Sequence, residues 1–253
     1  MSYLTKIIGT KIEEVSRMEP IDVTVTEPIT LLNVTKEGFH IISEIKRSSP
    51  SKGMIRETVD VAERARQYEQ AGATMISVLT DTTYFNGSFD DLRQVADVVT
   101  IPVLCKDFII DERQLDYAKH YGASVALLIV AALHPTRLHE LTRYARSIGL
   151  DVLVEVHDEA ELHIALELDD VLIGINNRDL KTFEVALETS IDLMNRYPDV
   201  TFVSESGVST VEAAARLKEA GASAILVGEA LMREEDPTRL LEELKTCSLK
   251  SVD

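Results

Sequence analysis

The chain has 253 residues, of which 45% are hydrophobic, and a formal net charge of −17. This length allows one large domain or two small ones, and the hydrophobic share is typical of a globular protein with a sizeable core. The acidic charge argues against a nucleic acid as the main partner, because binding to a phosphate backbone requires a positive surface.

Two further observations limit the class of protein. No apolar run approaches the length of a membrane-spanning helix, so we expect no membrane partner. The two cysteines, Cys105 and Cys247, are far apart and have no metal-ligand neighbours. We therefore expect a reduced, cytoplasmic protein without disulfides and without a metal site.

The N-terminal region differs from the rest of the chain. Ser2–Arg17 is amphipathic and of mixed charge, which predicts a helix, and it lacks the apolar core and cleavage site of a signal peptide. Glu19–Thr35 is expected to form a mostly extended connection. Because no linker or low-complexity segment follows, we predict a single domain over residues 1–253, with residues 1–40 as an N-terminal extension.

From about residue 40 onward one unit recurs: a short apolar run, a polar turn and a helical pattern that often ends at Gly-Ala. The continuous apolar character of these runs predicts parallel strands that are covered on both faces. The predicted strands are Ile41–Ile45, Met75–Leu79, Pro102–Cys105, Val125–Val130, Val152–Val156, Val171–Ile175, Thr201–Val203 and Ala224–Val227. The clearest predicted helices, each followed by a glycine stop, are Thr58–Ala71, Asp111–Tyr121, Thr136–Ile148 and Thr210–Ala220.

Eight strand–helix units in a chain of this length predict a (β/α)8 TIM barrel with an extra N-terminal helical segment. The main alternative is a doubly wound sheet, which would need fewer strands and a topological switch point. No Gly-x-Gly-x-x-Gly turn opens a helix, and this weakens a dinucleotide-binding interpretation.

The ends of the predicted strands carry acid–base side chains, and in such a barrel these ends form the active site. The residues at or just after the strand ends are Glu44, Lys46, Lys106, Glu155, Asn176, Glu205, Ser206, Gly207 and Gly228. We expect Lys46 and Lys106 to lower each other's pKa and so to act as acids, while Glu44 or Glu155 accepts a proton. The structural alternative for Lys106 and Glu155 is a plain ion pair that braces the barrel.

Two groups of residues suggest an anionic, aromatic ligand. Residues 47–53 combine two cations, three hydroxyls and a glycine, and Gly207 and Gly228 would let backbone N–H groups approach a phosphate. A tight turn alone would also explain each glycine. Phe85, Phe108 and Leu180 are either ordinary packing residues or the walls of an apolar slot for a ring, and both alternatives stay open.

These segments resemble the indole-3-glycerol phosphate synthases, the (β/α)8 enzymes of tryptophan biosynthesis. The most specific is 43–53 (SEIKRSSPSKG). The others are 77–80 (SVLT), 84–88 (YFNGS), 105–108 (CKDF), 153–157 (LVEVH), 174–180 (GINNRDL), 204–207 (SESG) and 227–232 (VGEALM). The resemblance covers nearly the whole chain and extends to the N-terminal helix.

The resemblance implies that 1-(2-carboxyphenylamino)-1-deoxyribulose 5-phosphate is closed to a ring, decarboxylated and dehydrated without a metal or organic cofactor. It implies Lys106 as the general acid, Glu155 and Glu44 as the carboxylates, and Lys46 as the partner of a substrate anion and a possible second acid. It assigns the remaining contacts as follows: Asn176, Arg178 and Ser206 orient the substrate, Gly207 and Gly228 bind its phosphate, Ser49 its carboxylate, and Phe85, Phe108 and Leu180 its ring. We expect a monomer.

The chain departs from the family pattern in three places: Ser43 where alanine is common, the pair Asp81-Thr82 in place of a Glu-Pro-like pair, and Glu229 where serine often occurs. Glu229 would remove a phosphate hydroxyl and add a negative charge. His157 follows Glu155 closely, but we expect it to cap a loop.

Two alternative functions agree less well with the sequence. A phosphoribosylanthranilate isomerase would use a cysteine and an aspartate, but strand alternation turns Cys105 away from the site. A non-catalytic barrel would lack at least one acid–base residue, and none is missing.

Overall fold

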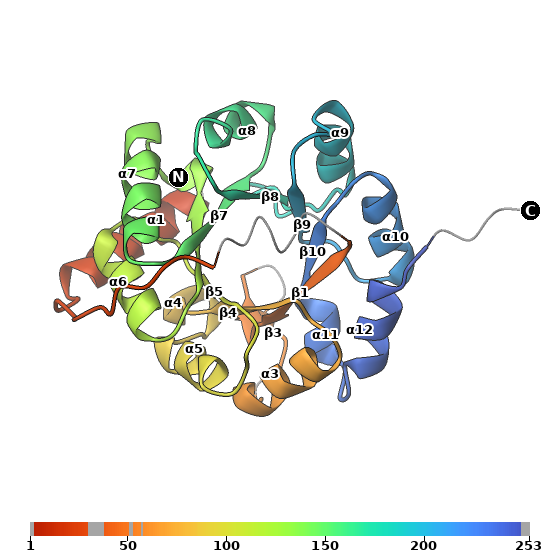
Figure 1. The fold of residues 1–253 in the computed structure, drawn as a ribbon, viewed down its shortest axis with the longest axis horizontal. Coiled ribbons are helices and arrows are strands. Elements are labelled where there is room, and N and C mark those ends of the chain that lie inside the picture. Colours follow the sequence, from red (N-terminus) through yellow and green to blue (C-terminus); the bar gives the residue numbers. More distant parts are fainter. Residues whose placement is uncertain (1–2, 30–37, 51–52, 57, 249–253) are drawn as a thin grey trace, which may run out of the picture.

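Eight parallel strands close into a barrel in the computed structural model, which describes residues 3–29, 38–50, 53–56 and 58–248 (Figure 1). The order around the barrel is β1-β10-β9-β8-β7-β6-β5-β4. These strands are β1 (His40–Ile45), β4 (Met75–Leu79), β5 (Val103–Lys106), β6 (Val125–Ile129), β7 (Asp151–Val156), β8 (Leu172–Asn176), β9 (Phe202–Glu205) and β10 (Ala224–Val227). The predicted (β/α)8 barrel is confirmed, and the ends of the predicted strands differ by at most two residues.

Helices cover the outside of the barrel (Figure 1). They are α3 (Val61–Gln70), α5 (Phe89–Ala96), α6 (Glu112–His120), α7 (Pro135–Ser147), α8 (Glu159–Ala165), α9 (Glu188–Arg196), α10 (Val211–Glu219) and α12 (Thr238–Lys245). Shorter elements lie in the loops: the hairpin of β2 (Ser48–Ser49) and β3 (Gly53–Met54), α4 (Thr82–Phe85), the 3-10 turn η1 (Val130–Ala132) and α11 (Glu229–Arg233). No helix within the described ranges is long and apolar enough to cross a membrane.

The four helices predicted after strands are confirmed. Three are shorter at both ends, and α7 begins and ends one residue earlier than predicted. The first begins at Val61 rather than Thr58, because the Asp60 side chain accepts a hydrogen bond from the backbone N–H of Glu63 and caps the helix there. The last strand residue predicted for β6, Val130, instead opens the 3-10 turn η1.

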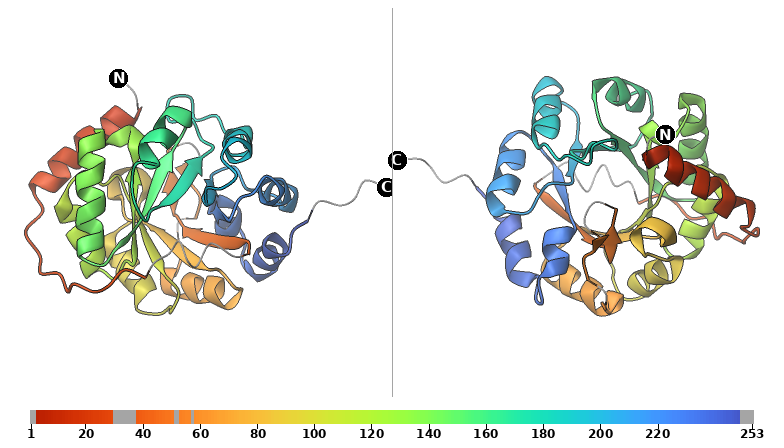
Figure 2. Two further views of the ribbon diagram at one scale, coloured as in Figure 1. Left: turned by 45° about the horizontal axis from the view of Figure 1, so that its top comes forward. Right: turned by 180° about the vertical axis from the view of Figure 1, so that it is seen from behind.

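The N-terminal helix α1 (Tyr3–Ser16) is confirmed and lies on the near side of the barrel in the right-hand view of Figure 2. Its buried residues, Ile7, Lys11 and Val15, are spaced four apart and so share one helix face. Ile7 packs into the apolar cluster of the barrel interior. Residues 18–29 form neither helix nor strand, and residues 30–35 of the predicted connection lie outside the described residues.

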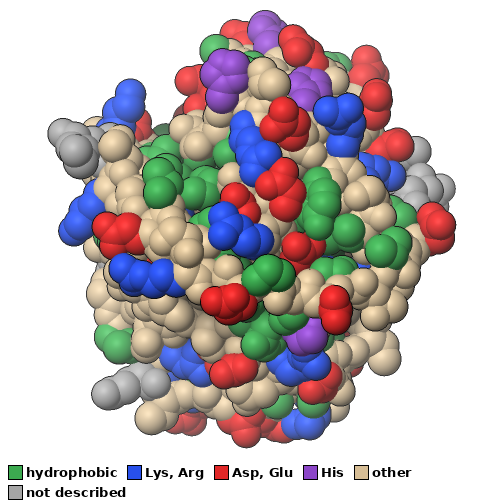
Figure 3. Space-filling view, turned by 90° about the vertical axis from the view of Figure 1, so that its left-hand side faces the viewer, with side chains coloured by type: hydrophobic (Ala, Val, Ile, Leu, Met, Phe, Trp, Pro, Cys, Tyr) green, Lys and Arg blue, Asp and Glu red, His purple; other side chains and the backbone are tan. Residues whose placement is uncertain are grey.

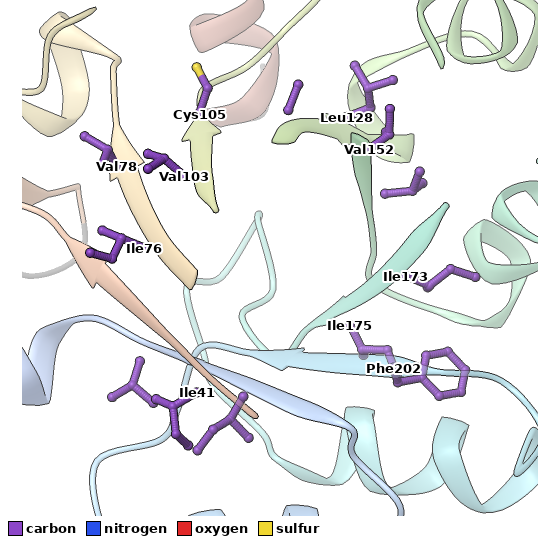
Figure 4. Packing of buried hydrophobic residues seen from close by; sticks show 14 of the residues in the cluster. Ile41, Ile76, Val78, Val103, Cys105, Leu128, Val152, Ile173, Ile175 and Phe202 are labelled. Atoms are coloured by element: carbon purple, nitrogen blue, oxygen red, sulfur yellow. The ribbon is translucent and has the colours of Figure 1, made fainter. Parts of the chain in front are cut away.

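The core has two apolar layers because successive strand residues point to opposite faces. One layer fills the barrel interior and includes Ile42, Leu104, Leu127, Leu153, Leu172 and Leu226. The other lies between strands and helices and includes Ile76, Cys105, Ile173 and Phe202, whose side chains point away from the barrel axis in Figure 4. Cys105 is fully buried in this outer layer, so the prediction that it faces away from the barrel mouth is confirmed.

Candidate active site

A cavity of about 1100 Å³ opens at the carboxyl ends of the barrel strands. It brings together all thirteen residues that the sequence analysis assigned to the site: Glu44, Lys46, Ser49, Phe85, Lys106, Phe108, Glu155, Asn176, Arg178, Leu180, Ser206, Gly207 and Gly228. It is also lined by Glu205 from β9, by Tyr3, Leu4 and Ile7 from α1, and by Glu229 and Arg233 from α11. No group of three or more metal-ligating side chains occurs among the described residues.

The ammonium of Lys106, the last residue of β5, lies among the carboxylates of the cavity. Its Nζ atom lies 2.5 Å from Oε2 of Glu205 and 3.4 Å from Oε2 of Glu155. Both carboxylates are almost fully buried, whereas 12% of the Lys106 side chain is exposed to the cavity. One cation therefore contacts two carboxylates from strands that do not pair with its own: β7, two places away in the barrel order, and β9, four places away.

Glycines make room for two of these carboxylates. A Cβ atom at Gly174, on β8, would lie 2.1 Å from Oε1 of Glu205, and a Cβ at Gly228 would lie 2.5 Å from Oε1 of Glu44. Any side chain at either position would displace the carboxylate. Glycine is therefore needed at position 228 to make room for Glu44, in addition to the expected approach of the backbone to a phosphate.

The charges around Lys106 set the protonation of the site. Burial lowers the pKa of Lys106, but Glu205, Glu155 and Glu44 together raise it above its ordinary value. The prediction that Lys46 would lower the pKa of Lys106 is therefore wrong, because carboxylates rather than a second ammonium dominate its surroundings. Lys46 is instead paired with Glu44, 2.5 Å away.

The two carboxylates on Lys106 titrate differently. For Glu155, burial opposes ionisation, but Lys106 and His157 hold the pKa below its usual range. For Glu205, burial together with Glu155 and Glu44 outweighs the attraction of Lys106 and raises the pKa to about 7. One ammonium cannot offset several buried carboxylates, so Glu205 is the group that carries a proton near neutrality.

Sequence reasoning assigned Glu205 no role, although one signal was present. Val203 belongs to the barrel interior, and residues two apart on a strand share a face. Glu205 should therefore also point inward at the end of β9. The Oε1 atom of Glu205 has no hydrogen-bond partner among the described residues.

His157 has a wider set of contacts than the expected loop cap. Its backbone N–H and its Nδ1 both contact Oε2 of Glu161, at 2.8 and 3.0 Å, which confirms the cap. Its Nε2 atom also lies 3.4 Å from Oε1 of Glu155, an ion-pair distance rather than a close hydrogen bond. Burial opposes the charged imidazole, but the two carboxylates raise its pKa to about 10. The charged His157 therefore favours the ionised form of Glu155.

An apolar wall lies beside the charged groups. The rings of Phe85 and Phe108 face the cavity with centroids 6.1 Å apart, and Leu180 lines the same space. Leu180 belongs to the loop after β8, where the Asn176 side chain accepts a hydrogen bond from the N–H of Arg178. The position of these three residues on the cavity surface favours the slot over packing alone.

Only part of the segment predicted to bind anions, residues 47–53, lines the cavity within the described residues. Ser49 lines the cavity, but Arg47 forms a two-pronged ion pair with Asp91 and does not line it. The expectation that Arg47 serves an anion is therefore wrong, and Ser51 and Lys52 lie outside the described residues. On the opposite loop, Gly207 has a positive φ of 88°, which suits glycine.

The charge of Glu229 is paired rather than isolated. Its Oε1 lies 2.9 Å from Nη2 of Arg233, one turn later on α11, and both residues line the cavity beside Gly228. The loop after β10 therefore presents a cation as well as the unexpected carboxylate.

Comparison with known proteins agrees with this geometry. The model of the family described as "Indole-3-glycerol phosphate synthase" matches residues 10–244. A protein named indole-3-glycerol phosphate synthase from an Exiguobacterium species is 94% identical over 253 residues and the alignment covers 100% of both chains. Proteins of the same name from Exiguobacterium sibiricum and Oceanobacillus iheyensis are 49% and 50% identical, with 96% and 92% of each chain covered.

Proposed function

Because this chain belongs to the indole-3-glycerol phosphate synthase family, we propose that its barrel-mouth cavity converts 1-(2-carboxyphenylamino)-1-deoxyribulose 5-phosphate into indole-3-glycerol phosphate, carbon dioxide and water. The observation that carries the proposal is the convergence of two ammonium groups, three carboxylates and an aromatic wall in one cavity. A cavity of this size is typical of small-molecule sites.

The substrate is held at three points. Its phosphate takes hydrogen bonds from the backbone N–H groups near Gly207 and Gly228, and Ser206 orients it. Its carboxylate is bound by Lys46 and the hydroxyl of Ser49. Its ring lies along Phe85, Phe108 and Leu180, which all line the same cavity. Fixing both ends brings the ring carbon next to the ketone carbon and reduces the entropic cost of closure.

Ring closure uses Lys106 as the general acid. The ring carbon that bears the carboxylate attacks the ketone carbon, and the developing alkoxide takes a proton from the Lys106 ammonium. The raised pKa keeps Lys106 protonated in the free site, so this proton is available before the substrate binds. The ionised Glu155 stabilises the positive charge that remains on the substrate nitrogen.

Loss of carbon dioxide then returns the bonding electrons to the ring and neutralises the nitrogen. The new hydroxyl leaves as water with a proton from Lys46, and a carboxylate removes a proton from the neighbouring carbon to complete the indole. Glu44 and Glu155 are both candidates for this base. Glu205 is placed to return a proton to Lys106, since it contacts the ammonium and titrates near neutrality.

A fluorescence assay tests the activity. The chain contains no tryptophan, so indole emission after mixing with the substrate comes from the product alone. We expect product emission from the wild-type protein, and a rate of emission increase lower by about 10²- to 10⁴-fold when Lys106 is replaced by methionine. A folded wild-type protein that gives no indole emission would refute the proposed activity.

We further propose that the chain acts as a cytoplasmic monomer without nucleic-acid partners, and as one domain in which residues 1–40 extend the barrel. The net charge of −17 supports the lack of a nucleic-acid partner. The face in Figure 3 also carries interspersed acidic and basic side chains rather than a basic stripe. Light scattering at several protein concentrations measures the mass directly, and a value near twice 28.1 kDa would refute the monomer.

A further inference from the structure

A buried lysine on the N-terminal helix stands outside the reaction described above. Lys11 lies one turn after Ile7 on α1, and only 2% of its surface is exposed. Its Nζ lies 2.7 Å from Oδ2 of Asp81 and 2.8 Å from Oδ1 of Asp107. It also contacts Glu14 of its own helix at 2.8 Å. A cation from α1 therefore joins two loops that follow barrel strands β4 and β5.

The two aspartates hold the backbone that carries the aromatic wall. Oδ1 of Asp81 accepts hydrogen bonds from the N–H groups of Tyr84 and Phe85, at 2.6 and 3.2 Å. Oδ1 of Asp107 accepts from the N–H of Phe108 at 2.7 Å. Each carboxylate thus fixes the turn that presents one of the two cavity-lining rings.

These carboxylates depend on Lys11 for charge compensation. Asp81 is fully buried, and its Oδ2 has no hydrogen-bond partner among the described residues apart from its ion pair with the Lys11 ammonium. Asp107 is also buried, and its other oxygen accepts a hydrogen bond from Thr80 at 2.8 Å. Without the ammonium, both negative charges would be uncompensated in the interior.

The same helix reaches the cavity itself. Tyr3, Leu4 and Ile7 line it, and the hydroxyl of Thr10 lies 2.8 Å from that of Tyr84 on α4. An apolar contact would dock a helix without burying three charges. The ion cluster instead fixes one register of α1 against both turns, which is the function that buried ionic groups serve best.

We propose that Lys11 is a positioning residue for the reaction: it fastens α1 across the barrel mouth and, through Asp81 and Asp107, sets the separation of Phe85 and Phe108 that the substrate ring requires. The role of the aromatic wall rests on the proposed function, whereas the fastening of α1 does not.

The first variant is Lys11→Met. We expect the KM for the substrate to rise about tenfold, since the ring is less well held, with a smaller fall in kcat. Relative to the wild type, backbone hydrogen exchange should become faster in residues 3–16 and 82–86, whereas exchange in β7 should not change. Arg17→Met, at the residue directly after α1, is the control, because the ion pair of Arg17 with Glu13 is exposed and 3.7 Å long. It should change neither KM nor exchange.

A second variant separates positioning from stability. Lys11→Met combined with Asp81→Asn and Asp107→Asn buries no charge, and each asparagine oxygen still accepts the backbone hydrogen bonds. We expect the thermal stability lost in Lys11→Met to return while KM stays raised and α1 still exchanges fast. Recovery of KM together with stability would overturn the proposal, as would unchanged α1 exchange in Lys11→Met. A wild-type protein that makes no indole would refute the proposed function instead, and the exchange data would still test the fastening.

Discussion

The Nζ atom of Lys106 on β5 lies 2.5 Å from Oε2 of Glu205 on β9, so a single ammonium links two strands that do not pair with each other. This contact puts the proposed proton donor, Lys106, beside the carboxylate that titrates near neutrality. The pair cannot be changed on one side without altering the charge state of the other.

Replacing Lys106 by methionine removes the proposed general acid and should lower kcat by about 10²- to 10⁴-fold. Circular dichroism and a thermal melt would show that the fold survives. Lys218→Met is the control, because Lys218 donates to the carbonyl of Cys247 outside the cavity. Near-normal turnover in the Lys106 variant would exclude it as the acid.

The raised pKa of Glu205 makes stability depend on pH. In the unfolded chain the carboxyl ionises near its ordinary pKa, whereas in the folded protein it stays protonated up to about pH 7. The folded state therefore binds more protons between these values, and stability falls as pH rises through this window. Glu205→Gln should remove this dependence. In the wild type, we expect it to lower the free energy of unfolding by about 1–3 kcal/mol between pH 5 and 8.

Thermal or urea unfolding of both proteins across that pH range measures the difference. The glutamine variant should gain stability relative to wild type as pH rises. A constant difference from pH 5 to 8 would mean that the Glu205 carboxyl is ionised throughout.

Gly174→Ala tests the carboxylate without deleting it. The new Cβ would lie 2.1 Å from Oε1 of Glu205 and would push the carboxylate off Lys106. We expect kcat to fall about 10- to 100-fold, because small displacements of catalytic groups have large effects. Gly9→Ala on α1 is the matched control, since nothing lies within 4 Å of its Cβ. If both variants keep full activity, the position of Glu205 does not matter for turnover.

Glu229→Ser tests the unusual residue beside Gly228. Removing the carboxylate releases Arg233 from its ion pair and leaves a cation at the end of the cavity assigned to the phosphate. The KM should fall by roughly threefold at low salt, and the effect should shrink at high salt. Glu243→Ser breaks a similar pair with Arg239 on α12, away from the cavity, and should leave KM unchanged. A raised KM in Glu229→Ser would contradict the prediction.

The strands and the site positions could be predicted because they depend on local patterns. Apolar runs separated by polar turns mark buried parallel strands, and in such a barrel the residues that follow them share one end. This was sufficient to bring Lys46, Lys106 and Glu155 to one mouth. The roles of these residues in the reaction remain proposals.

The charge states could not be predicted, because they depend on contacts between distant parts of the chain. Lys106 meets a carboxylate 99 residues away, and Arg47 meets one 44 residues away. Sequence spacing shows neither pairing. From the sequence we expected the two lysines at the mouth, Lys46 and Lys106, to repel each other. In the structure, carboxylates surround Lys106 instead. The burial of Lys11 could not be predicted either, because its partners Asp81 and Asp107 are distant in the sequence and a lysine on an amphipathic helix is usually exposed.

The closure of the barrel by β1 and β10 bears on how the protein is made. His40 pairs with Ala224, so the first strand to leave the ribosome must wait for the last one before its second edge is covered. Glu44 on β1 and Gly228 just after β10 lie together only after that closure. A nascent chain stalled before β10 would expose unpaired strand edges, which are prone to aggregate. Catalytic competence therefore arises late in translation, in one step with the completion of the sheet.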